Sequence, residues 1–275
     1  MNSIDLVPIG GLGNRIFAIC SAIVYARMSN RTLRIFWFKD KGCYCDFNKL
    51  FSISNGINNV IIVRPSLIDF IIHDNPRRKN FWIPSIFQRI IYDRCIYYSK
   101  EKILPSYPYF ERMDGHKIFF VNCWKYWEEP NMWSYIRISS DIERKVEKKM
   151  ANIPQNIIGV HIRLTDNTLT REDSPVDLFI EKMKKEIQKD RLTCFYLATD
   201  EEWVKKKLRE IFGEKMYYSE QKAQRDTEEG IINAFTELLI LSKTKKILAG
   251  HSSFSELASC MSGTPFELVS TKIKY

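Results

Sequence analysis

The chain has 275 residues, of which 45% are hydrophobic and 27% charged, and a formal net charge of +9. This composition excludes a disordered or fibrous chain and fits a globular protein of one large domain or two ordinary ones. The basic balance favours an acidic partner, such as phosphate groups, nucleic acid or an anionic membrane surface.

The cysteines and the early apolar run indicate in which cellular compartment the protein is found. The seven cysteines are scattered, and no C-x-x-C or His-x-x-x-His spacing indicates a zinc site or a disulfide framework. The apolar run at residues 16–26 is too short to span a bilayer, and no basic segment precedes it as in a signal peptide. We therefore expect reduced thiols and a cytoplasmic location.

The first 150 residues open with a strand, a glycine-rich loop and a helix, as a doubly wound α/β unit does. In the helix, predicted at residues 16–28, the apolar side chains recur on one face. Strands are predicted at residues 4–9, 33–38, 59–63 and 117–121. Between residues 64 and 135 aromatic, proline and basic residues are interleaved, and we expect mostly irregular loops and short helices there.

The second half of the chain is more regular. A charged helix at residues 141–150 is followed by Pro154, and we place a domain boundary between residues 152 and 153. Strands and helices that alternate with short connections predict a parallel sheet covered on both faces. The predicted strands are residues 157–163, 194–198, a short one near 216, 246–249 and 266–269; the predicted helices are residues 176–189, 201–212, 228–243 and 253–262.

The glycine loop at residues 10–15 is similar to a dinucleotide-binding fingerprint. However, Ile16 occupies the third glycine position, and Asp40 lies later than the usual ribose-binding acid, which disfavours a dehydrogenase. The glycines indicate a close backbone approach to a ligand at a helix N-terminus, with Asn14 and Arg15 beside it. A tight turn without a ligand is the alternative.

The strand at residues 157–163 ends in a polar cluster. Arg163 offers a planar fork of donors that suits a phosphate group. His161 can donate to a phosphate or sugar oxygen, and Asp166 can orient Arg163 or take part in proton transfer. A satisfied buried pair of His161 and Arg163 is the alternative.

Two further predicted strands also turn polar at their C-terminal ends. One leads into Thr199 and Asp200, and the other into residues 249–256, where serines precede a helix and form a potential anion site. We expect these strand ends to share one edge of a parallel sheet, which is where α/β proteins bind ligands. Because the sequence contains no Asp-x-Asp motif, we expect Arg163 and helix dipoles, rather than a divalent metal, to supply positive charge.

Four motifs, at residues 10–15, 161–166, 198–200 and 252–254, resemble in this order those of the fucosyltransferase superfamily. That group contains α1,2- and α1,6-fucosyltransferases and protein O-fucosyltransferases. The resemblance implies an α/β, GT-B-like fold with two Rossmann-like domains whose parallel sheets face a central cleft. It implies an acceptor-side domain at residues 1–152 and a nucleotide-sugar donor domain at residues 153–275.

The same resemblance implies a glycosyltransferase that moves fucose from GDP-fucose to a hydroxyl of a glycan acceptor, with inversion and without a metal or other cofactor. Cell-surface polysaccharide or glycoconjugate synthesis is the expected setting. The candidate catalytic residues are Arg163, which matches the arginine on the β-phosphate, His161, Asp166 and Glu172, with Asp173 a further candidate base. The candidate donor-binding residues are Gly11, Gly13, Asn14, Arg15, Thr199, Asp200, His251, Ser252, Ser253 and Phe254.

Two departures from the family pattern leave the linkage open. The α1,2 and α1,6 enzymes usually have a second arginine where this chain has Leu164. The α1,2 enzymes have tryptophans where it has Glu256 and Leu257.

Other functions also remain open. One is a GT-B glycosyltransferase with another nucleotide-sugar donor, and another is a non-enzymatic basic protein that binds polyanions. No nucleic-acid-binding motif is visible, so we expect no nucleic acid partner. The basic helices also allow a peripheral contact with an anionic inner membrane face, beside a lipid-linked acceptor.

Overall fold

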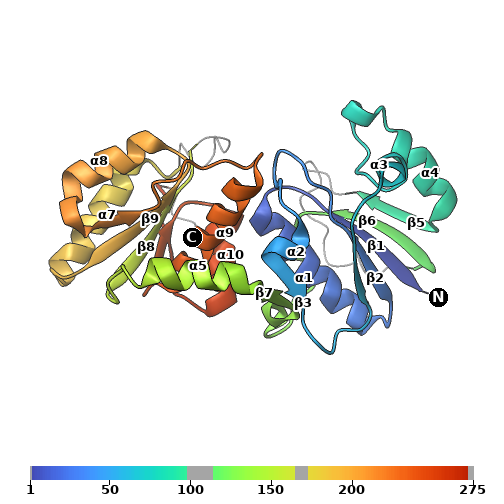
Figure 1. Ribbon diagram of the computed structural model, residues 1–275, viewed down its shortest axis with the longest axis horizontal. Helices are drawn as coiled ribbons and strands as arrows, with labels where there is room; N and C mark the ends of the chain where they lie inside the picture. The colour runs from blue at the N-terminus through green and yellow to red at the C-terminus, as the bar shows by residue number, and fades with distance from the viewer. Residues whose placement is uncertain (1, 98–113, 165–172, 272–275) are drawn as a thin grey trace. The chain divides into compact units, whose positions relative to one another are not determined.

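The computed structural model describes residues 2–97, 114–164 and 173–271 (Figure 1). The chain divides into two compact units, Met1–Arg137 and Ile138–Tyr275. Each unit is built around its own five-stranded sheet, and every pairing within the two sheets is parallel. Two Rossmann-like parallel sheets confirm the predicted α/β fold class.

The N-terminal sheet has the strand order β4-β2-β1-β6-β5. Its strands are β1 (Ser3–Pro8), β2 (Thr32–Phe36), β4 (Val60–Val63), β5 (Arg94–Tyr97) and β6 (Lys117–Asn122). Helix α1 (Leu12–Met28) follows β1 and begins four residues before the predicted start. The predicted apolar face of α1 is fully buried, as an amphipathic helix against a sheet requires.

The segment expected to be mostly irregular contains more structure than the sequence pattern indicated. It holds α3 (Leu67–Ile72), the 3-10 turn η1 (Arg78–Asn80), α4 (Ile83–Ile91), β5, β6 and the 3-10 turn η4 (Met132–Tyr135). Helix α4 escaped prediction because the residues that it buries are Pro84 and Gln88, while its isoleucines are exposed. The usual apolar-inward pattern is thus reversed there.

The division between the units lies before the charged helix rather than after it. The short strand β7 (Ile136–Ile138) pairs with β3 (Phe51–Ile53), which follows α2 (Phe47–Leu50). Helix α5 (Ser140–Met150) then packs against α9 (Glu228–Leu241) of the second unit. The boundary expected between residues 152 and 153 therefore lies at the other end of α5, because its apolar face is buried in the second unit.

The C-terminal sheet has the strand order β10-β9-β8-β11-β12. The predicted alternation of strands and helices is confirmed, with bounds that differ by a few residues. Its strands are β8 (Ile157–Ile162), β9 (Cys194–Thr199), β10 (Met216–Tyr218), β11 (Ile247–Ala249) and β12 (Phe266–Leu268). The helices that follow α5 are α7 (Val176–Lys189), α8 (Glu202–Phe212), which leads into the 3-10 turn η5 (Gly213–Lys215), α9 and α10 (Ser253–Ser262).

Helices cover both faces of this sheet (Figure 1). Helices α7 and α8 bury apolar side chains against one face of β8 and β9, while α9 packs against the other with α5 and α10 beside it. Gly159 in β8 permits that close packing, because a Cβ there would lie 2.8 Å from Leu241 and 2.9 Å from the Thr244 hydroxyl. None of the described helices combines the length and the apolar character needed to cross a membrane.

Candidate functional site

The polar ends of three neighbouring strands meet at one edge of the C-terminal sheet. Strand β8 lies between β9 and β11, with His161 in register with Ala198 on one side and Ala249 on the other. Because the three strands are parallel, the residues that follow them gather at the same edge. The predicted convergence of these strand ends is confirmed.

His161 is buried at this edge as a neutral ring. It is 7% exposed, and its ring centroid lies 4.9 Å from that of Phe254 at an interplanar angle of 32°. Burial, and then the positive charge of Arg163, lower the pKa of His161 from 6.5 to about 3. The imidazole is therefore uncharged at physiological pH.

The hydrogen bonds around His161 define its tautomer. Its Nδ1 lies 3.1 Å from the Ser255 hydroxyl oxygen. That hydroxyl donates to the Ser252 carbonyl oxygen at 3.3 Å, and a carbonyl oxygen can only accept. We infer that Nδ1 donates to Ser255 and that Nε2 carries the lone pair.

The two residues after His161 and Ile162 have different environments. Arg163 is half-buried, and its positive charge lowers the pKa of His161. Leu164 belongs to the apolar cluster beneath α7 and α8 and is 9% exposed. At the position where the resembling enzymes carry a second arginine, this chain therefore has a core residue.

A second arginine nevertheless approaches the same edge from another loop. Nη2 of Arg225 lies 3.9 Å from Oδ2 of Asp200, and its charge also lowers the pKa of His161. Oδ1 of Asp200 accepts a hydrogen bond of 3.0 Å from the backbone N–H of Leu164. Asp200 thus ties the ends of β8 and β9 together and holds Arg225 beside them.

Gly230 allows the loop that carries Arg225 to lie against α9. A Cβ at Gly230 would lie only 2.0 Å from the carbonyl oxygen of Gln224, the residue before Arg225. The N–H of Gly230 also donates to the hydroxyl of Thr227, which caps α9, at 3.1 Å. The glycine therefore helps to set the position of the second arginine.

The N-terminus of α10 brings a partial positive charge to the site. The Ser252 hydroxyl caps the helix by accepting the N–H of Phe254 at 3.3 Å, and Ser253 is the first helical residue. His251 is half-buried in the connection from β11. Together with Arg163 and Arg225, this helix end makes an environment that favours an anion.

The remaining predicted residues of this unit have other positions. Thr199 is buried, and its hydroxyl accepts the N–H of Glu201 at 3.3 Å, so it stabilises the turn after β9. Asp166 and Glu172 lie outside the described residues. Asp173, the further candidate base, is buried, and its carbonyl oxygen accepts the N–H of Thr271 at 2.7 Å.

In the N-terminal unit the glycine loop joins β1 to α1. Gly10 has a φ of +87°, and Gly11 is the N-cap residue of α1. Gly13 is buried within the helix, whereas Asn14 is half-buried. Donor binding by these residues stays a prediction.

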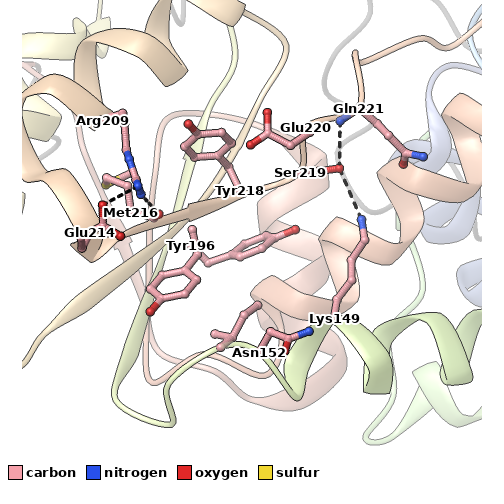
Figure 2. A pocket seen from close by; sticks show the side chains of 12 residues that line it. Lys149, Asn152, Tyr196, Arg209, Glu214, Met216, Tyr218, Ser219, Glu220 and Gln221 are labelled. Carbon is pink, nitrogen blue, oxygen red and sulfur yellow. Dashed lines mark hydrogen bonds and ion pairs between the residues drawn. The ribbon is translucent and has the colours of Figure 1, made fainter.

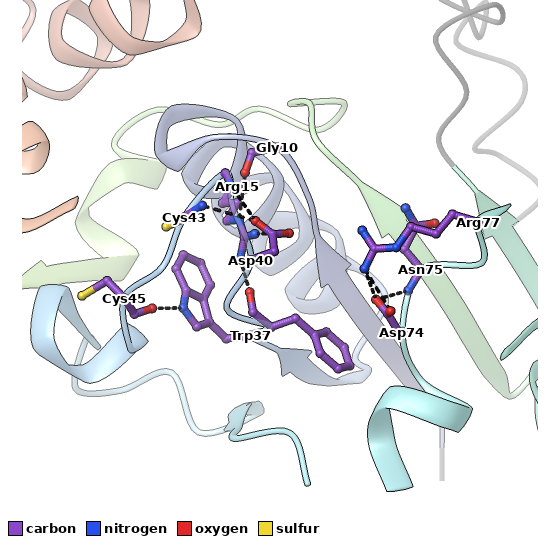
Figure 3. Close-up of polar contacts among 11 residues, drawn as sticks. Gly10, Arg15, Trp37, Asp40, Cys43, Cys45, Asp74, Asn75 and Arg77 are labelled. Carbon is purple, nitrogen blue, oxygen red and sulfur yellow. Dashed lines mark hydrogen bonds and ion pairs between the residues drawn. The ribbon is translucent and has the colours of Figure 1, made fainter. Parts of the chain in front are cut away.

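Arg15 has a structural role in this loop. Its guanidinium is fully buried, donates to the carbonyl oxygens of Gly10 (3.0 Å) and Phe38 (2.6 Å), and pairs with Asp40 at 2.8 Å (Figure 3). It also lies over the Trp37 ring, 4.9 Å from the centroid. Because its side chain is buried and makes these internal contacts, Arg15 fixes the loop from within, and donor binding by Arg15 stays a prediction.

A pocket of about 590 Å³ lies along β10 in the C-terminal unit (Figure 2). Tyr196 and Lys149 line it, and the Tyr196 hydroxyl is buried without a hydrogen-bond partner in the described part of the chain. Near these two residues, burial raises the pKa of Glu237 to about 7. None of the predicted site residues lines this pocket, so it is distinct from the His161 cluster.

Sequence reasoning missed two contributors to the His161 cluster. Ser255 stood within a recognised motif but is a helix residue whose contact with His161 spans 94 positions in sequence. Arg225 lies in a connection that carries no motif, and no sequence signal distinguishes it from the other basic residues of the chain. Among the described residues, no group of three or more His, Cys, Asp or Glu side chains is arranged to hold a metal ion.

Comparison with known proteins gives a result only at the level of structure. No protein-family model matches the sequence, and no curated protein matches it significantly. Solved structures do match over nearly the whole chain, and they show that its two-unit α/β fold is shared with solved fucosyltransferases.

Particular neighbours include the NodZ alpha-1,6-fucosyltransferase, solved after soaking with GDP-fucose. It has a TM-score of 0.65 and 18% identity, with 95% of this chain and 93% of that chain covered. NodZ from Bradyrhizobium gives a TM-score of 0.65 and 19% identity over 94% and 92% of the two chains. POFUT1 in complex with GDP gives a TM-score of 0.59 and 14% identity over 98% of both chains. At these identities the likeness establishes the fold.

Proposed function

We propose that this chain is a glycosyltransferase that moves fucose from GDP-fucose to a hydroxyl of a glycan acceptor, with inversion and without a metal ion. The observation that carries the proposal is the anion-favouring edge of the C-terminal sheet, where Arg163, Arg225 and the N-terminus of α10 surround the neutral His161. The fold shared with fucosyltransferases solved with GDP and GDP-fucose supports this choice of donor.

In the proposed reaction the acceptor oxygen attacks the anomeric carbon of fucose. The bond from that carbon to the β-phosphate oxygen breaks as the new carbon–oxygen bond forms, and the acceptor proton passes to a base. Negative charge develops on the departing GDP, where Arg163 and the helix end stabilise it. Preorganised donors of this kind each lower a barrier by about 3–4 kcal/mol.

Arg225 takes the place of the second arginine that the resembling enzymes carry at the position of Leu164. Its guanidinium is held by Asp200 and lies near enough to His161 to lower the imidazole pKa. A diphosphate carries more charge than one arginine neutralises, so two guanidinium groups on different loops suit it better than one.

His161 serves as a hydrogen-bonding group and not as a cation. Because Nδ1 donates to Ser255, Nε2 is the nitrogen left to accept a hydrogen bond, for example from a sugar hydroxyl. The base that deprotonates the acceptor is not His161 in this proposal, because a pKa of about 3 makes the imidazole a weak base. Asp166 and Glu172 keep that role as candidates.

The wider setting is also proposed. The acceptor is a glycan of a cell-surface polysaccharide or glycoconjugate, carried in some cases on a lipid, and the reaction takes place in the cytoplasm. The reduced cysteines expected from the sequence fit that compartment: all seven cysteines are free thiols in the structure.

Release of GDP from a panel of nucleotide sugars, supplied with a mixture of glycan acceptors, tests the proposal. We expect GDP-fucose to react fastest and Arg163→Ala to lose most of that activity. If another nucleotide sugar reacts faster, that sugar is the donor, and the proposed site is unchanged. Near-normal transfer by Arg163→Ala would contradict the role of the arginine.

The non-enzymatic alternative makes a different prediction. A polyanion-binding protein would show binding that weakens steeply with salt and survives the loss of His161 and Arg163. Such a result, together with no reaction of any nucleotide sugar, would favour that alternative.

A further inference from the structure

Many large apolar side chains of the N-terminal unit are exposed along α3 and α4, two helices that contact each other. We call this set the α3–α4 surface, and its most exposed members are Leu67 (88%), Phe81 (82%) and Ile90 (78%). Its other members are Ile68, Phe70, Ile71, Trp82, Ile83, Ile86, Phe87 and Ile91. Monomeric globular proteins rarely expose so many large apolar side chains together, and such a patch marks an interaction site.

Helix α4 is anchored by a polar residue and presents its apolar stripe outward. Gln88 is fully buried, and its amide nitrogen donates to the carbonyl oxygens of Ile72 (2.8 Å) and Asp74 (2.9 Å). The exposed positions 83, 86, 87 and 90 follow the spacing of a single helix face. A helix that only needed to pack on its own sheet would turn this stripe inward.

The chain also holds two aromatic residues outward in a strained backbone conformation. Phe81 and Trp82 have φ values of +51° and +60°, which residues other than glycine rarely adopt. Buried Asp74 stabilises the preceding turn by pairing with Arg77 at 3.0 Å (Figure 3). It also accepts a hydrogen bond from the Asn80 amide at 3.2 Å. Phe81 and Trp82 are therefore held exposed in a strained backbone conformation by the contacts of Asp74.

The segment that carries the α3–α4 surface is basic. Residues 64–91 contain five basic side chains and two acidic ones, a balance of 5 − 2 = +3. Both acids are engaged, Asp69 with Ser66 and His73, and Asp74 with Arg77. The exposed cations are Arg64, Arg78, Lys79 and Arg89.

We propose that the α3–α4 surface docks this chain on an anionic lipid bilayer. Phe81, Trp82 and the isoleucines of α4 enter the boundary between headgroups and acyl chains, where tryptophan and exposed apolar helix faces are stable. The surrounding cations contact the anionic headgroups. A symmetric pair of chains is the less suitable occupant, because it would bring two basic surfaces together.

Flotation with lipid vesicles tests this surface independently of the transfer reaction. We expect the wild-type chain to bind vesicles that contain phosphatidylglycerol, and to bind pure phosphatidylcholine vesicles much less. Phe81→Ser/Trp82→Ser/Ile86→Ser should weaken binding at least tenfold. Leu192→Ser, which removes a 78% exposed leucine of the C-terminal unit, is the matched control and should bind like the wild type.

Two further measurements examine the parts of the proposal separately. Arg78→Gln/Lys79→Gln should weaken binding by roughly fivefold for each charge removed, because each cation near an anionic surface contributes about that much. Brominated lipids should quench tryptophan fluorescence in the wild type and quench it less in Trp82→Phe, which keeps vesicle binding.

Three results would overturn the proposal. The first is no binding of the wild type to anionic vesicles. The second is unchanged binding by the triple variant, with circular dichroism establishing that it is folded. The third is a wild-type dimer in sedimentation that the triple variant converts to monomer without any vesicle binding, which would make a second copy the occupant.

Discussion

Gly230→Ala tests how the second arginine reaches the site. The new Cβ would lie 2.0 Å from the Gln224 carbonyl oxygen, whereas real Cβ contacts stay beyond 3.0 Å, so that carbonyl must move by about 1 Å. Arg225 is the next residue, and its contact with Asp200 is already long at 3.9 Å, so a shift of this size away from Asp200 would break it. Alanine would otherwise favour the helix by up to about 1 kcal/mol, so any loss of stability comes from the collision.

The effect on GDP binding follows from the loss of one charged contact. A hydrogen bond to a charged group contributes about 1.5–3 kcal/mol, so we expect GDP to bind about 10- to 100-fold more weakly. Isothermal titration of Gly230→Ala, Arg225→Gln and the double variant measures this. Because both changes remove the same contact, their effects should not add. The GDP affinity of the double variant should equal that of whichever single variant binds GDP more weakly.

Lys222→Gln is the control for this experiment, since it removes an exposed cation from the same loop. It should leave GDP binding unchanged apart from a small salt-dependent effect. If Gly230→Ala binds GDP like the wild type, or if its loss adds in full to that of Arg225→Gln, the loop does not position the arginine in the way described.

Three other substitutions test the energetics of the fold. Arg15→Ala should lower the free energy of unfolding by about 1.5–3 kcal/mol in chemical denaturation, because it leaves the Gly10 and Phe38 carbonyl oxygens without their charged donor; a loss below about 1 kcal/mol would contradict the structural role. Burial raises the folded-state pKa of Glu237 to about 7, so the stability of the wild type should fall by at most about 3 kcal/mol as the pH rises from 4.5 to 7. Glu237→Gln should abolish this fall. Because the folded state keeps the His161 imidazole neutral, the stability of the wild type should fall as the pH falls from 6.5 towards 3. His161→Gln should abolish this fall. Parallel pH profiles for wild type and variant would refute either assignment.

The C-terminal unit was largely predictable because its signals are local. Each buried strand is a short apolar run, and each run ends in polar residues that parallel topology must bring to one edge. His161, Arg163 and Ser252 could therefore be grouped from the sequence. The partner of His161 could not, because Ser255 also satisfies the ordinary pattern of a polar residue in the first turn of a helix.

What the sequence could not reveal depends on packing between distant segments. Arg225 reaches the site only because Gly230 leaves room for Gln224, and a lone glycine in a helical pattern does not indicate which segment approaches it. The contacts of Arg15 with Asp40 and the Phe38 carbonyl oxygen likewise join residues 23 or more positions apart, and the glycine-loop motif does not indicate them. Helix α4 was missed because a sequence pattern assumes that apolar residues face the core. In α4 the buried residues are Pro84 and Gln88, and the apolar residues face outward.

The proposed donor chemistry is tested most directly by titrating GDP-fucose into wild type and Arg163→Ala in the presence of EDTA. We predict that the wild type binds GDP-fucose with EDTA present and that Arg163→Ala binds it at least tenfold more weakly, as the loss of a charged hydrogen bond requires. Absence of binding by the folded wild type, or equal binding by Arg163→Ala, would contradict the account.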